Sequence, residues 1–381
     1  MKYLHVIQAN ERNSYNLFLQ MHERYDLSDH TFFVCNYRRV VSRAFPKFYE
    51  FKNFVYMEEK GTIKKLIKFY KLFKEADHIV LHSLIFTSKK YLLFLYLFRS
   101  FLKKATWIEW GADLYNWELP GLTLKEKFLN HINREIRKSV SQVGLTIEAD
   151  EEEVHKQLGE DIKCIYTPLP FAGNRLELLE ATRPKKEVDK GFVRVQVAHN
   201  ALQLNNHINI LSRLEKFKHE NMQLVLPLSY GTFGINGRYG GTTYRKSVIK
   251  CAELFFTKEK TVVMSKEMPL DRYLRYLWSV DVAVFNVNRP IVLANIIYML
   301  YMGKKVYLPE NSPHYKFFVE KGLPIYKTED IDRMTYEEFI YNPKQDHVPT
   351  WILNRLTPGE DIKNWDVLIN GDFLDDHLVT V

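Results

Sequence analysis

The sequence predicts an α/β protein with two doubly wound parallel sheets, and three observations support this fold class. Strand patterns alternate with helix patterns from the first residues onward. The same alternation begins again after the charged, proline-containing stretch 181–190, which is typical of a linker. The chain has 381 residues, more than the roughly 250–300 residues at which a single hydrophobic core stops growing.

The first half of the chain holds seven strand patterns with helical patterns between them. The strands are expected at Leu4–Gln8, Thr31–Cys35, Phe54–Tyr56, His78–His82, Thr106–Trp110, Gln142–Ile147 and Ile162–Tyr166. The helices are expected at Ser14–Arg24, Ile63–Ala76, Leu124–Ser139 and Ala149–Leu158. Strands that alternate with helices of this length are typical of βαβ units, whose strands run parallel.

The second half repeats this organisation. Its strands are expected at Val193–Ala198, Leu224–Pro227, Thr261–Met264, Asp281–Phe285, Lys305–Leu308 and Leu323–Tyr326, and its helices at His207–His219, Tyr244–Phe255, 269–279 and 291–302. We therefore predict a first domain over 1–180 and a second over 191–335. The last segment, 336–381, is expected to cross back to the first domain and to bury Trp351 and Trp365. Two such domains that face each other enclose a cleft, where ligands commonly bind.

Composition and charge exclude several classes of protein. The chain is 46% hydrophobic and 26% charged, which is an ordinary globular composition. Three widely separated cysteines are expected to be reduced thiols in the cytoplasm. We expect neither a signal peptide nor a membrane-spanning helix, because no apolar run is long enough. Residues 1–150 contain 24 Lys and Arg against 16 Asp and Glu, whereas 151–381 contain 30 of each, so an anionic partner is expected at the first half.

Two neighbouring stretches of the first half combine basic and apolar side chains. Helix 63–76 places five lysines opposite an apolar stripe, and residues 88–104 are almost entirely apolar between flanking lysine pairs. Both stretches fit helices that cover the sheet, and both fit helices that lie in a lipid interface. No nucleic-acid-binding motif or arginine-rich stripe is present. We predict that residues 63–104 contact an anionic membrane surface and that the protein binds no nucleic acid.

The stretch Trp107–Tyr115 reads WIEWGADLY and passes from a strand pattern through a glycine to an acid and an aromatic residue. Glycine allows a sharp turn at Gly111, because it adopts positive φ at little cost. A carboxylate directly after a strand, such as that of Asp113, lies where open α/β sheets bind their ligands. The pattern predicts either a chemical role for Asp113 or a cap on the next helix.

Three junctions between strands and helices in the second half carry candidate ligand-binding residues. The candidates are His199, Asn200, Asn206 and His207 at the first junction, Pro227 and Tyr230 at the second, and Arg289 and Asn295 at the third. The N-terminal N–H groups of a helix suit a diphosphate, and a guanidinium neutralises phosphate well. The glycine-rich loop Gly231–Gly241 allows the backbone to approach a ligand closely. Plain helix caps and a flexible loop would also explain these patterns.

The motifs of several cofactors and reactions are missing from the sequence. It contains no Gly-x-Gly-x-x-Gly dinucleotide fingerprint, no P-loop and no Gly-x-Ser-x-Gly motif. Its His, Cys, Asp and Glu residues show no metal-ligand spacing. We therefore predict a site without a metal and without a resident cofactor.

The segment Trp110–Tyr115 resembles the Trp-Gly-Ala-Asp-Leu-Tyr signature of the TDP-N-acetylfucosamine:lipid II N-acetylfucosaminyltransferase family. The likeness extends over about residues 1–370 and is thin between the motifs. It includes His82, His199-Asn200, Asn206-His207, Leu226-Pro227, Tyr230, Asp281, Arg289, Gly303, Pro313 and Tyr315. Three positions depart from the family pattern: His199 stands where the family has glycine, Asn206 where it has aspartate, and Asn295 where it has threonine.

The resemblance implies a GT-B glycosyltransferase fold and a metal-independent reaction with a TDP- or UDP-sugar, such as an acetamido-deoxyhexose. It also implies a lipid-linked saccharide acceptor in bacterial surface-glycan synthesis, and a cytoplasmic enzyme held peripherally at the inner face of the plasma membrane. The junction residues above would bind the donor, while Gly111 and Tyr115 would belong to the acceptor loop. The general base would be Asp113, with His82 the second candidate and Glu109 the third. The alternatives are a protein or soluble-glycan acceptor, and an inactive GT-B subunit that scaffolds a partner transferase.

Overall fold

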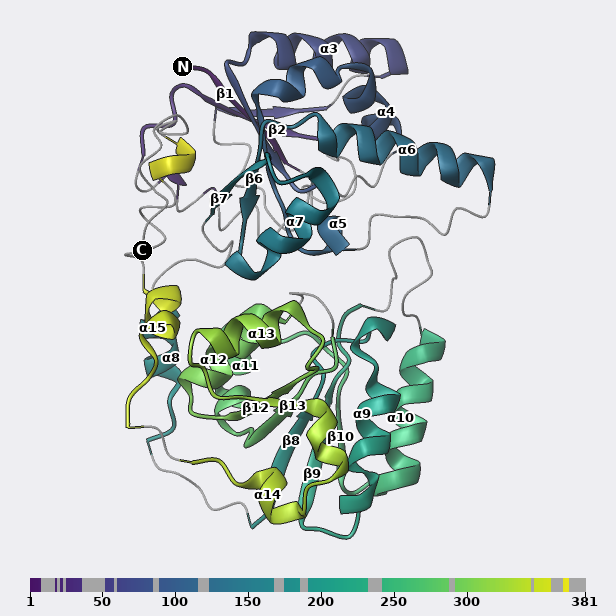
Figure 1. The fold of residues 1–381 in the computed structure, drawn as a ribbon, viewed down its shortest axis with the longest axis vertical. Helices are drawn as coiled ribbons and strands as arrows, with labels where there is room; N and C mark the ends of the chain where they lie inside the picture. Colours follow the sequence, from purple (N-terminus) through teal and green to yellow (C-terminus); the bar gives the residue numbers. More distant parts are fainter. Residues whose placement is uncertain are drawn as a thin grey trace. The chain divides into compact units, whose positions relative to one another are not determined.

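The computed structural model describes residues 1–7, 18, 21–22, 25–35, 52–57, 60–84, 89–115, 123–167, 175–185, 191–231, 242–287, 292–343, 346–357 and 366–369. The chain divides into two compact units, each built around its own sheet (Figure 1). Unit 1 comprises Met1–Gly173 and Pro358–Val381, and unit 2 comprises Asn174–Thr357.

The described strands of unit 1 form a seven-stranded parallel sheet. Their spatial order is β3 (Phe54–Tyr56), β2 (His30–Val34), β1 (Tyr3–Ile7), β4 (His78–His82), β5 (Ala105–Ile108), β6 (Gln142–Leu145) and β7 (Lys163–Tyr166). Because the strands are parallel, their carboxyl ends all lie at one edge. The order reverses between β1 and β4, and sheets of this kind bind ligands at such a switch point.

Helices pack on one face of the unit 1 sheet (Figure 1). They are α3 (Thr62–Glu75), α4 (Lys89–Leu97), α6 (Leu124–Lys138) and α7 (Glu151–Leu158). Side chains alternate across a strand, so Leu4 and Val6 of β1 join the core beneath these helices, while Tyr3 and Ile7 join the core of the opposite face. The C-terminal residues Leu368 and Ile369 pack into that second core. The segment that returns from unit 2 therefore helps to bury the open face of the first sheet.

The described strands of unit 2 form a six-stranded parallel sheet. Their spatial order is β10 (Thr261–Met264), β9 (Met222–Pro227), β8 (Val193–Val197), β11 (Val282–Val284), β12 (Lys305–Leu308) and β13 (Ile325–Lys327). The helices are α8 (Arg175–Thr182), α9 (His207–Leu214), α10 (Thr242–Phe256), α11 (Leu270–Trp278), α12 (Leu293–Tyr301), α13 (Pro313–Glu320), α14 (Tyr336–Ile340) and α15 (Thr350–Leu356). The strand order reverses between β8 and β11, so both units have the same order around their switch points.

The predicted fold class is confirmed, but the structure places the domain boundaries elsewhere. Residues 175–180 were expected in the first domain, but they form most of helix α8, which belongs to unit 2. Leu179 is buried there, and its carbonyl accepts a hydrogen bond from the Trp278 indole. Helix α14 also belongs to unit 2, where Phe339 stacks on Phe217. The return to unit 1 begins at Pro358 and not at 336, since both α14 and α15 bury their apolar sides in unit 2. Trp365 lies outside the described residues.

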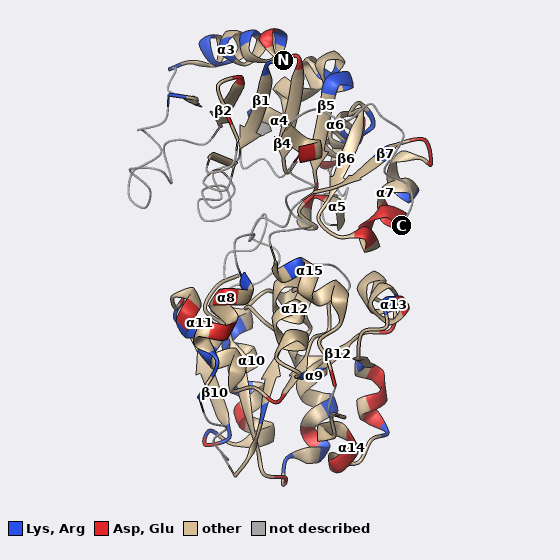
Figure 2. Ribbon diagram, turned by 90° about the vertical axis from the view of Figure 1, so that its left-hand side faces the viewer, with Lys and Arg blue, Asp and Glu red and all other residues tan. Residues whose placement is uncertain are grey.

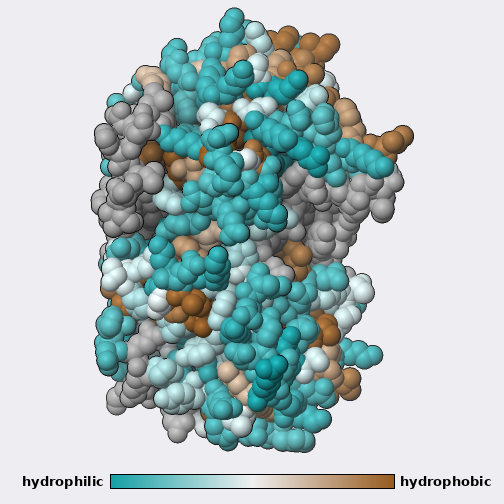
Figure 3. Space-filling view, viewed as in Figure 1, coloured by the Kyte–Doolittle hydropathy of each residue, from teal (hydrophilic) through white to brown (hydrophobic). Residues whose placement is uncertain are grey.

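The two basic, apolar stretches of unit 1 bury only part of their apolar side chains. Helix α3 buries Phe69 and Phe73 but leaves Ile63, Ile67 and Tyr70 exposed among its lysines, and Figure 2 shows this basic face. Helix α4 buries most of its apolar side chains and exposes Leu93 and Leu97. In Figure 3 hydrophobic surface is visible over part of α3 and over the outer end of α6. No described helix is long and apolar enough to cross a membrane.

Candidate functional site

The turn after β5 places two acidic residues that were predicted as site residues, Glu109 and Asp113, at the carboxyl edge of the unit 1 sheet. Gly111 takes φ +72°, a left-handed conformation that favours glycine. The turn leads into the single helical turn α5 (Ala112–Tyr115). Glu109 and Asp113 point inward from either side of this turn, and both side chains are fully buried. The WGADLY motif thus forms a compact corner whose acids are directed into the protein.

The carboxylate of Asp113 accepts three hydrogen bonds. Its Oδ2 accepts from the backbone N–H of Leu84 at 2.9 Å and from the indole of Trp107 at 2.8 Å. Its Oδ1 accepts from the backbone N–H of Trp110 at 2.8 Å. These bonds tie the loop after β4 to the end of β5. Because Leu84 follows the β4 residue His82 by two positions, Asp113 helps to fix the backbone that carries this histidine.

Glu109 is held in the same corner by backbone and hydroxyl donors. Its carboxylate accepts hydrogen bonds from the N–H of Gly111 at 2.5 Å and from the N–H and hydroxyl of Thr146 at 3.2 and 3.1 Å. Burial raises the pKa of Glu109 well above its usual range, and the charges of Asp150 and Asp113 add to this effect. Glu109 is therefore poorly suited to ionise and act as a base near neutral pH.

Tyr115 connects this corner to the start of α7. Its hydroxyl donates a hydrogen bond to Asp150 at 2.6 Å. Burial raises the pKa of Tyr115, and the adjacent carboxylate of Asp150 raises it further. Tyr115 therefore stays neutral and acts as a hydrogen-bond donor.

A chain of three buried histidines crosses the sheet beside this corner. His82 Nε2 lies 3.0 Å from His5 Nδ1, and His5 Nε2 lies 2.9 Å from His30 Nδ1. The register makes this possible, because His82 pairs with Ile7 at the end of β1 while His30 pairs with Tyr3 at its start. The imidazoles of His82, His5 and His30 therefore line one face of β4, β1 and β2 in succession.

Burial keeps the three rings neutral. It lowers the pKa of His82 to about 4 and holds the pKa of His5 well below its usual range. It also lowers the pKa of His30 to about 4, although the exposed carboxylates of Asp29 and Asp26 oppose the shift. The other ring nitrogen of His82, Nδ1, is buried and has no hydrogen-bond partner among the described residues. Sequence reasoning found His82 but missed His5 and His30, for which the only signal was a histidine inside each strand.

At the carboxyl edge of unit 2, a cluster of hydrogen-bonded amide side chains follows β8. Asn200 accepts hydrogen bonds from the Leu202 N–H at 2.9 Å and from Asn205 Nδ2 at 2.7 Å, and its own amide lies 2.7 Å from His199 Nε2. Ala198 takes a positive φ of 58° directly before this turn. His199 and Asn200 are buried, so they shape the loop from beneath.

The N-terminus of α9 follows this amide cluster in the chain and is exposed. Its cap residue Asn206 has left-handed backbone angles, and its amide donates to the carbonyl of Asn286, which follows β11, at 3.1 Å. The first turn of α9 carries no acidic residue. His207 is buried beneath it, 3.1 Å from the Tyr244 hydroxyl, and burial lowers its pKa to about 4. The bond between Asn206 and Asn286 bridges β8 and β11, which flank the switch point of unit 2.

The loop after β9 packs directly on the loop after β8. The carbonyl of Tyr230 accepts a hydrogen bond from the Ala201 N–H at 2.8 Å. Gly231 has φ +85°, and a Cβ there would lie 3.0 Å from the Leu202 side chain, so only glycine fits. Pro227 ends β9, and Tyr230 is exposed beside its loop.

The third predicted junction is described only in part. Asn295, in the first turn of α12, accepts a hydrogen bond from the Tyr273 hydroxyl at 2.7 Å. Arg289 and residues 232–241 lie outside the described residues. The structure therefore brings the predicted residues into two groups. The first is His82, Glu109, Gly111, Asp113 and Tyr115 in unit 1, and the second is His199, Asn200, Asn206, His207, Pro227 and Tyr230 in unit 2.

Comparisons with known proteins find one matching family model and several solved structures of similar fold. A family model described as 4-alpha-L-fucosyltransferase, glycosyl transferase group 56, matches residues 11–341. The alpha,alpha-trehalose 6-phosphate synthase of Burkholderia multivorans has a similar fold, with a TM-score of 0.62 and 11% identity over 97% of this chain and 96% of that chain. A glycosyltransferase of Rickettsia africae has a TM-score of 0.52 and 12% identity over 97% and 99% of the two chains.

A trehalose-6-phosphate protein from E. coli, bound with UDP-2-fluoro glucose, has a TM-score of 0.55 and 9% identity over 98% of each chain. At such low identity these structures establish the fold alone, and that fold is GT-B.

Proposed function

Because the chain belongs to the 4-alpha-L-fucosyltransferase family, glycosyl transferase group 56, we propose that it transfers a fucose-type deoxyhexose, such as an acetamido-deoxyhexose, from a TDP- or UDP-sugar to a lipid-linked saccharide. The chain is a glycosyltransferase with a GT-B fold. The family match over 11–341 is the observation that carries the proposal. The nucleotide sugar in the E. coli structure of similar fold supports the class of donor.

We place the donor diphosphate at the N-terminus of α9. Three features support this site: the helix N–H groups and dipole attract an anion, the first turn has no acid, and the helix begins at the switch point of the sheet. The amides of Asn206 and Asn286 each donate one hydrogen bond within the protein, to the Asn286 carbonyl and to Asn209, and their second N–H groups would point to the phosphates. The leaving diphosphate would then be stabilised without a metal, and Arg289 is predicted to contribute its charge.

We assign the general base to His82 and a positioning role to Asp113. The base must have a lone pair that is free to accept the proton of the acceptor hydroxyl. Both oxygens of Asp113 are engaged by three N–H donors, and burial raises the pKa of Glu109. His82 is neutral, and its Nδ1 has no partner among the described residues. Asp113 would act through Leu84, keeping His82 at the end of β4.

The histidine chain gives the proton from the acceptor a route out of the site. His82 Nδ1 would accept the proton and pass its Nε2 proton to His5 Nδ1, and His5 would pass its Nε2 proton to His30. Each ring exchanges one tautomer for the other and stays neutral. This matters because an imidazolium is costly to bury. The proton would leave near the exposed carboxylates of Asp26 and Asp29.

A lipid-linked acceptor requires contact with a membrane. Ile63 and Ile67 of α3 are 74% and 49% exposed among lysines, and Leu124 and Phe128 of α6 are also exposed. Apolar side chains with surrounding lysines are typical of helices that rest on anionic lipid. We therefore propose peripheral binding at the cytoplasmic face of the plasma membrane through α3, α4 and α6.

A thermal-shift screen against TDP, UDP, GDP, CMP and their sugars tests the donor site first. A ligand that binds only the folded protein raises its stability by RT ln(1 + [L]/Kd), so TDP or UDP should raise Tm. No shift with any nucleotide would favour the inactive scaffold and reject the donor assignment. Turnover with a soluble glycan but not with a polyprenyl-linked one would reject the lipid acceptor.

Vesicle binding tests the membrane contact. The protein should sediment with anionic vesicles and poorly with neutral ones, and Ile63→Glu should weaken this binding relative to Val262→Glu in unit 2, where the replaced side chain is also exposed. Equal sedimentation of the two variants would assign the exposed apolar side chains another partner.

A further inference from the structure

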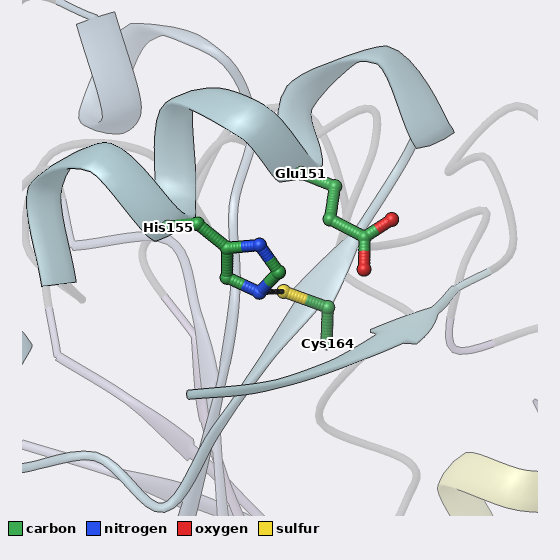
Figure 4. Close-up of side chains that lie close together, drawn as sticks. All are labelled: Glu151, His155 and Cys164. Carbon is green, nitrogen blue, oxygen red and sulfur yellow. Dashed lines mark hydrogen bonds between the residues drawn. The ribbon is translucent and has the colours of Figure 1, made fainter. Parts of the chain in front are cut away.

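We propose that Glu151, His155 and Cys164 form a zinc site that fastens α7 to β7. Figure 4 shows the three side chains converging from the helix and the neighbouring strand. Their ligand atoms all lie within 4.8 Å of one another, and Cys164 Sγ is 3.7 Å from His155 Nε2. The site belongs to no part of the proposed transfer reaction, so the two proposals stand or fall separately.

The fold creates this cluster from residues whose linear spacing does not resemble a metal motif. Glu151 and His155 are four positions apart in α7, and residues at i and i+4 lie on the same face of a helix. Gly159 ends α7 with φ +106°, which turns the chain back into β7. Cys164 in β7 then lies against the face that carries the other two side chains. The sequence-based prediction of no metal considered spacing alone and could not include this return.

The three donor types are those that zinc prefers. Zinc binds cysteine sulfur, histidine nitrogen and carboxylate oxygen in a tetrahedral arrangement, and a water molecule can complete three protein ligands. Three further contacts surround the set, and one of them joins His155 Nε2 to the carbonyl oxygen of Ile162 at 3.3 Å. His155 Nδ1 lies 3.6 Å from Glu160 Oε2, and a carboxylate behind a ligand histidine is a common second partner in zinc sites. The Tyr166 hydroxyl donates to Glu151 at 3.1 Å.

Zinc binding would also balance the local charge. Burial and, to a lesser extent, the nearby carboxylate of Glu151 raise the pKa of Cys164 to about 12, so without a metal the side chain is a neutral thiol. On binding, the S–H bond breaks, the proton passes to solvent and the sulfur bonds to zinc. The thiolate and the Glu151 carboxylate then neutralise the two positive charges of the ion.

The position of the site suggests what it stabilises. Glu151 directly follows Asp150, which accepts the hydrogen bond from Tyr115. A zinc ion at Glu151 would hold the first turn of α7, and with it the carboxylate that orients Tyr115 at the carboxyl edge. The ion would therefore have a structural role in unit 1.

The experiment measures metal binding to the tag-free full chain. After treatment with chelator, the wild-type protein should bind one zinc ion in competition with a chromophoric indicator and release one proton from the thiol. With cobalt in place of zinc it should show a thiolate-to-cobalt charge-transfer band in the near ultraviolet. Cys164→Ser should lose that band and weaken zinc binding at least tenfold, and Glu160→Gln should weaken it about tenfold.

Cys251→Ser is the matched control, because Cys251 is a free, half-buried thiol of α10 that belongs to no metal-binding group among the described residues. This variant should bind zinc and cobalt as the wild type does. Zinc binding that survives in Cys164→Ser, a cobalt complex without a thiolate band, or equal losses in the two cysteine variants would overturn the proposal. Each readout is independent of glycosyl transfer.

Discussion

At the switch point of unit 1 the polar side chains are buried and bonded to one another, whereas at that of unit 2 the start of a helix is exposed above its buried amides. Glu109, Asp113 and His82 are almost inaccessible to solvent. Asn206 and the following residues of the first turn of α9, Ile208 and Asn209, are exposed. The strand order around both switch points is the same, so the difference comes from the side chains and the loops.

This difference matches two tasks of a transferase. Activating a hydroxyl requires a base held at a fixed position, and buried hydrogen bonds provide that rigidity. Holding a diphosphate requires several N–H donors and a favourable dipole open to the ligand. The same strand order around the switch point is therefore compatible with the acid–base chemistry proposed for one unit and the anion binding proposed for the other.

The largest expected effect is that of removing the proposed base in unit 1. His82→Gln should lower kcat about 100- to 10,000-fold, the usual contribution of general acid–base catalysis, while the Tm shift caused by the nucleotide stays that of the wild type. Turnover that is unchanged in this variant would remove His82 from the mechanism. If the Tm shift caused by the nucleotide is lost together with turnover, the substitution disturbs the donor site as well.

The histidine chain is tested by His5→Phe, which keeps an aromatic ring stacked near Phe32 and removes both hydrogen bonds. We expect kcat to fall about tenfold or more, KM for the donor to stay constant, and the pH profile of kcat to change as His82 loses its proton exit. If only KM rises and the pH profile of kcat is unchanged, His5 has a packing role and carries no proton.

Asp113→Asn tests whether this carboxylate positions the loop after β4. The amide would present N–H groups to a neighbouring N–H donor, leaving a buried group unsatisfied, so the free energy of unfolding should fall by about 1–3 kcal/mol. Turnover should fall with it through displacement of His82. Urea unfolding measures the first effect. An unchanged urea midpoint together with abolished turnover would restore Asp113 as the base.

Acid should destabilise the protein through its buried histidines. His82, His30 and His207 have pKa values near 4 in the folded state, against about 6.5 when unfolded. Between these values the unfolded chain binds more protons, so stability falls as pH decreases from about 6.5 to 4. Urea midpoints at pH 7 and pH 5 measure this, and the His5→Phe variant should show a shallower decline.

The smallest expected effect concerns the exposed helix end of unit 2. Ile208 is 40% exposed in the first turn of α9. Ile208→Glu should weaken nucleotide binding about two- to fivefold relative to Ile208→Gln. The carboxylate would repel the diphosphate and compete with it for the helix N-terminus, where one negative charge contributes about 0.3–1 kcal/mol. Equal affinities for the two variants would place the diphosphate elsewhere.

The sequence by itself determined the architecture, since strand and helix periods are local properties. Strands β3, β4, β10 and β12 have the predicted bounds, and each of the others differs from prediction by at most two residues at either end. The residues after β5 and β8 could be found because parallel strands place their carboxyl ends at a common edge. Boundaries were harder to predict, because the unit that buries α8 or α14 depends on distant partners such as Trp278 and Phe217.

Only the tertiary structure decided what the site residues contact. From the sequence, Asp113 could be either a general base or a helix cap. In the structure its two carboxylate oxygens accept hydrogen bonds from the N–H groups of Leu84, Trp107 and Trp110. The histidine chain depends on the register of β2, β1 and β4, which no local pattern encodes. The cluster of Glu151, His155 and Cys164 likewise needs the return of β7 along α7. Hydrogen bonding and metal binding require distances set by pairing between remote segments, and these distances exist only once the chain has folded.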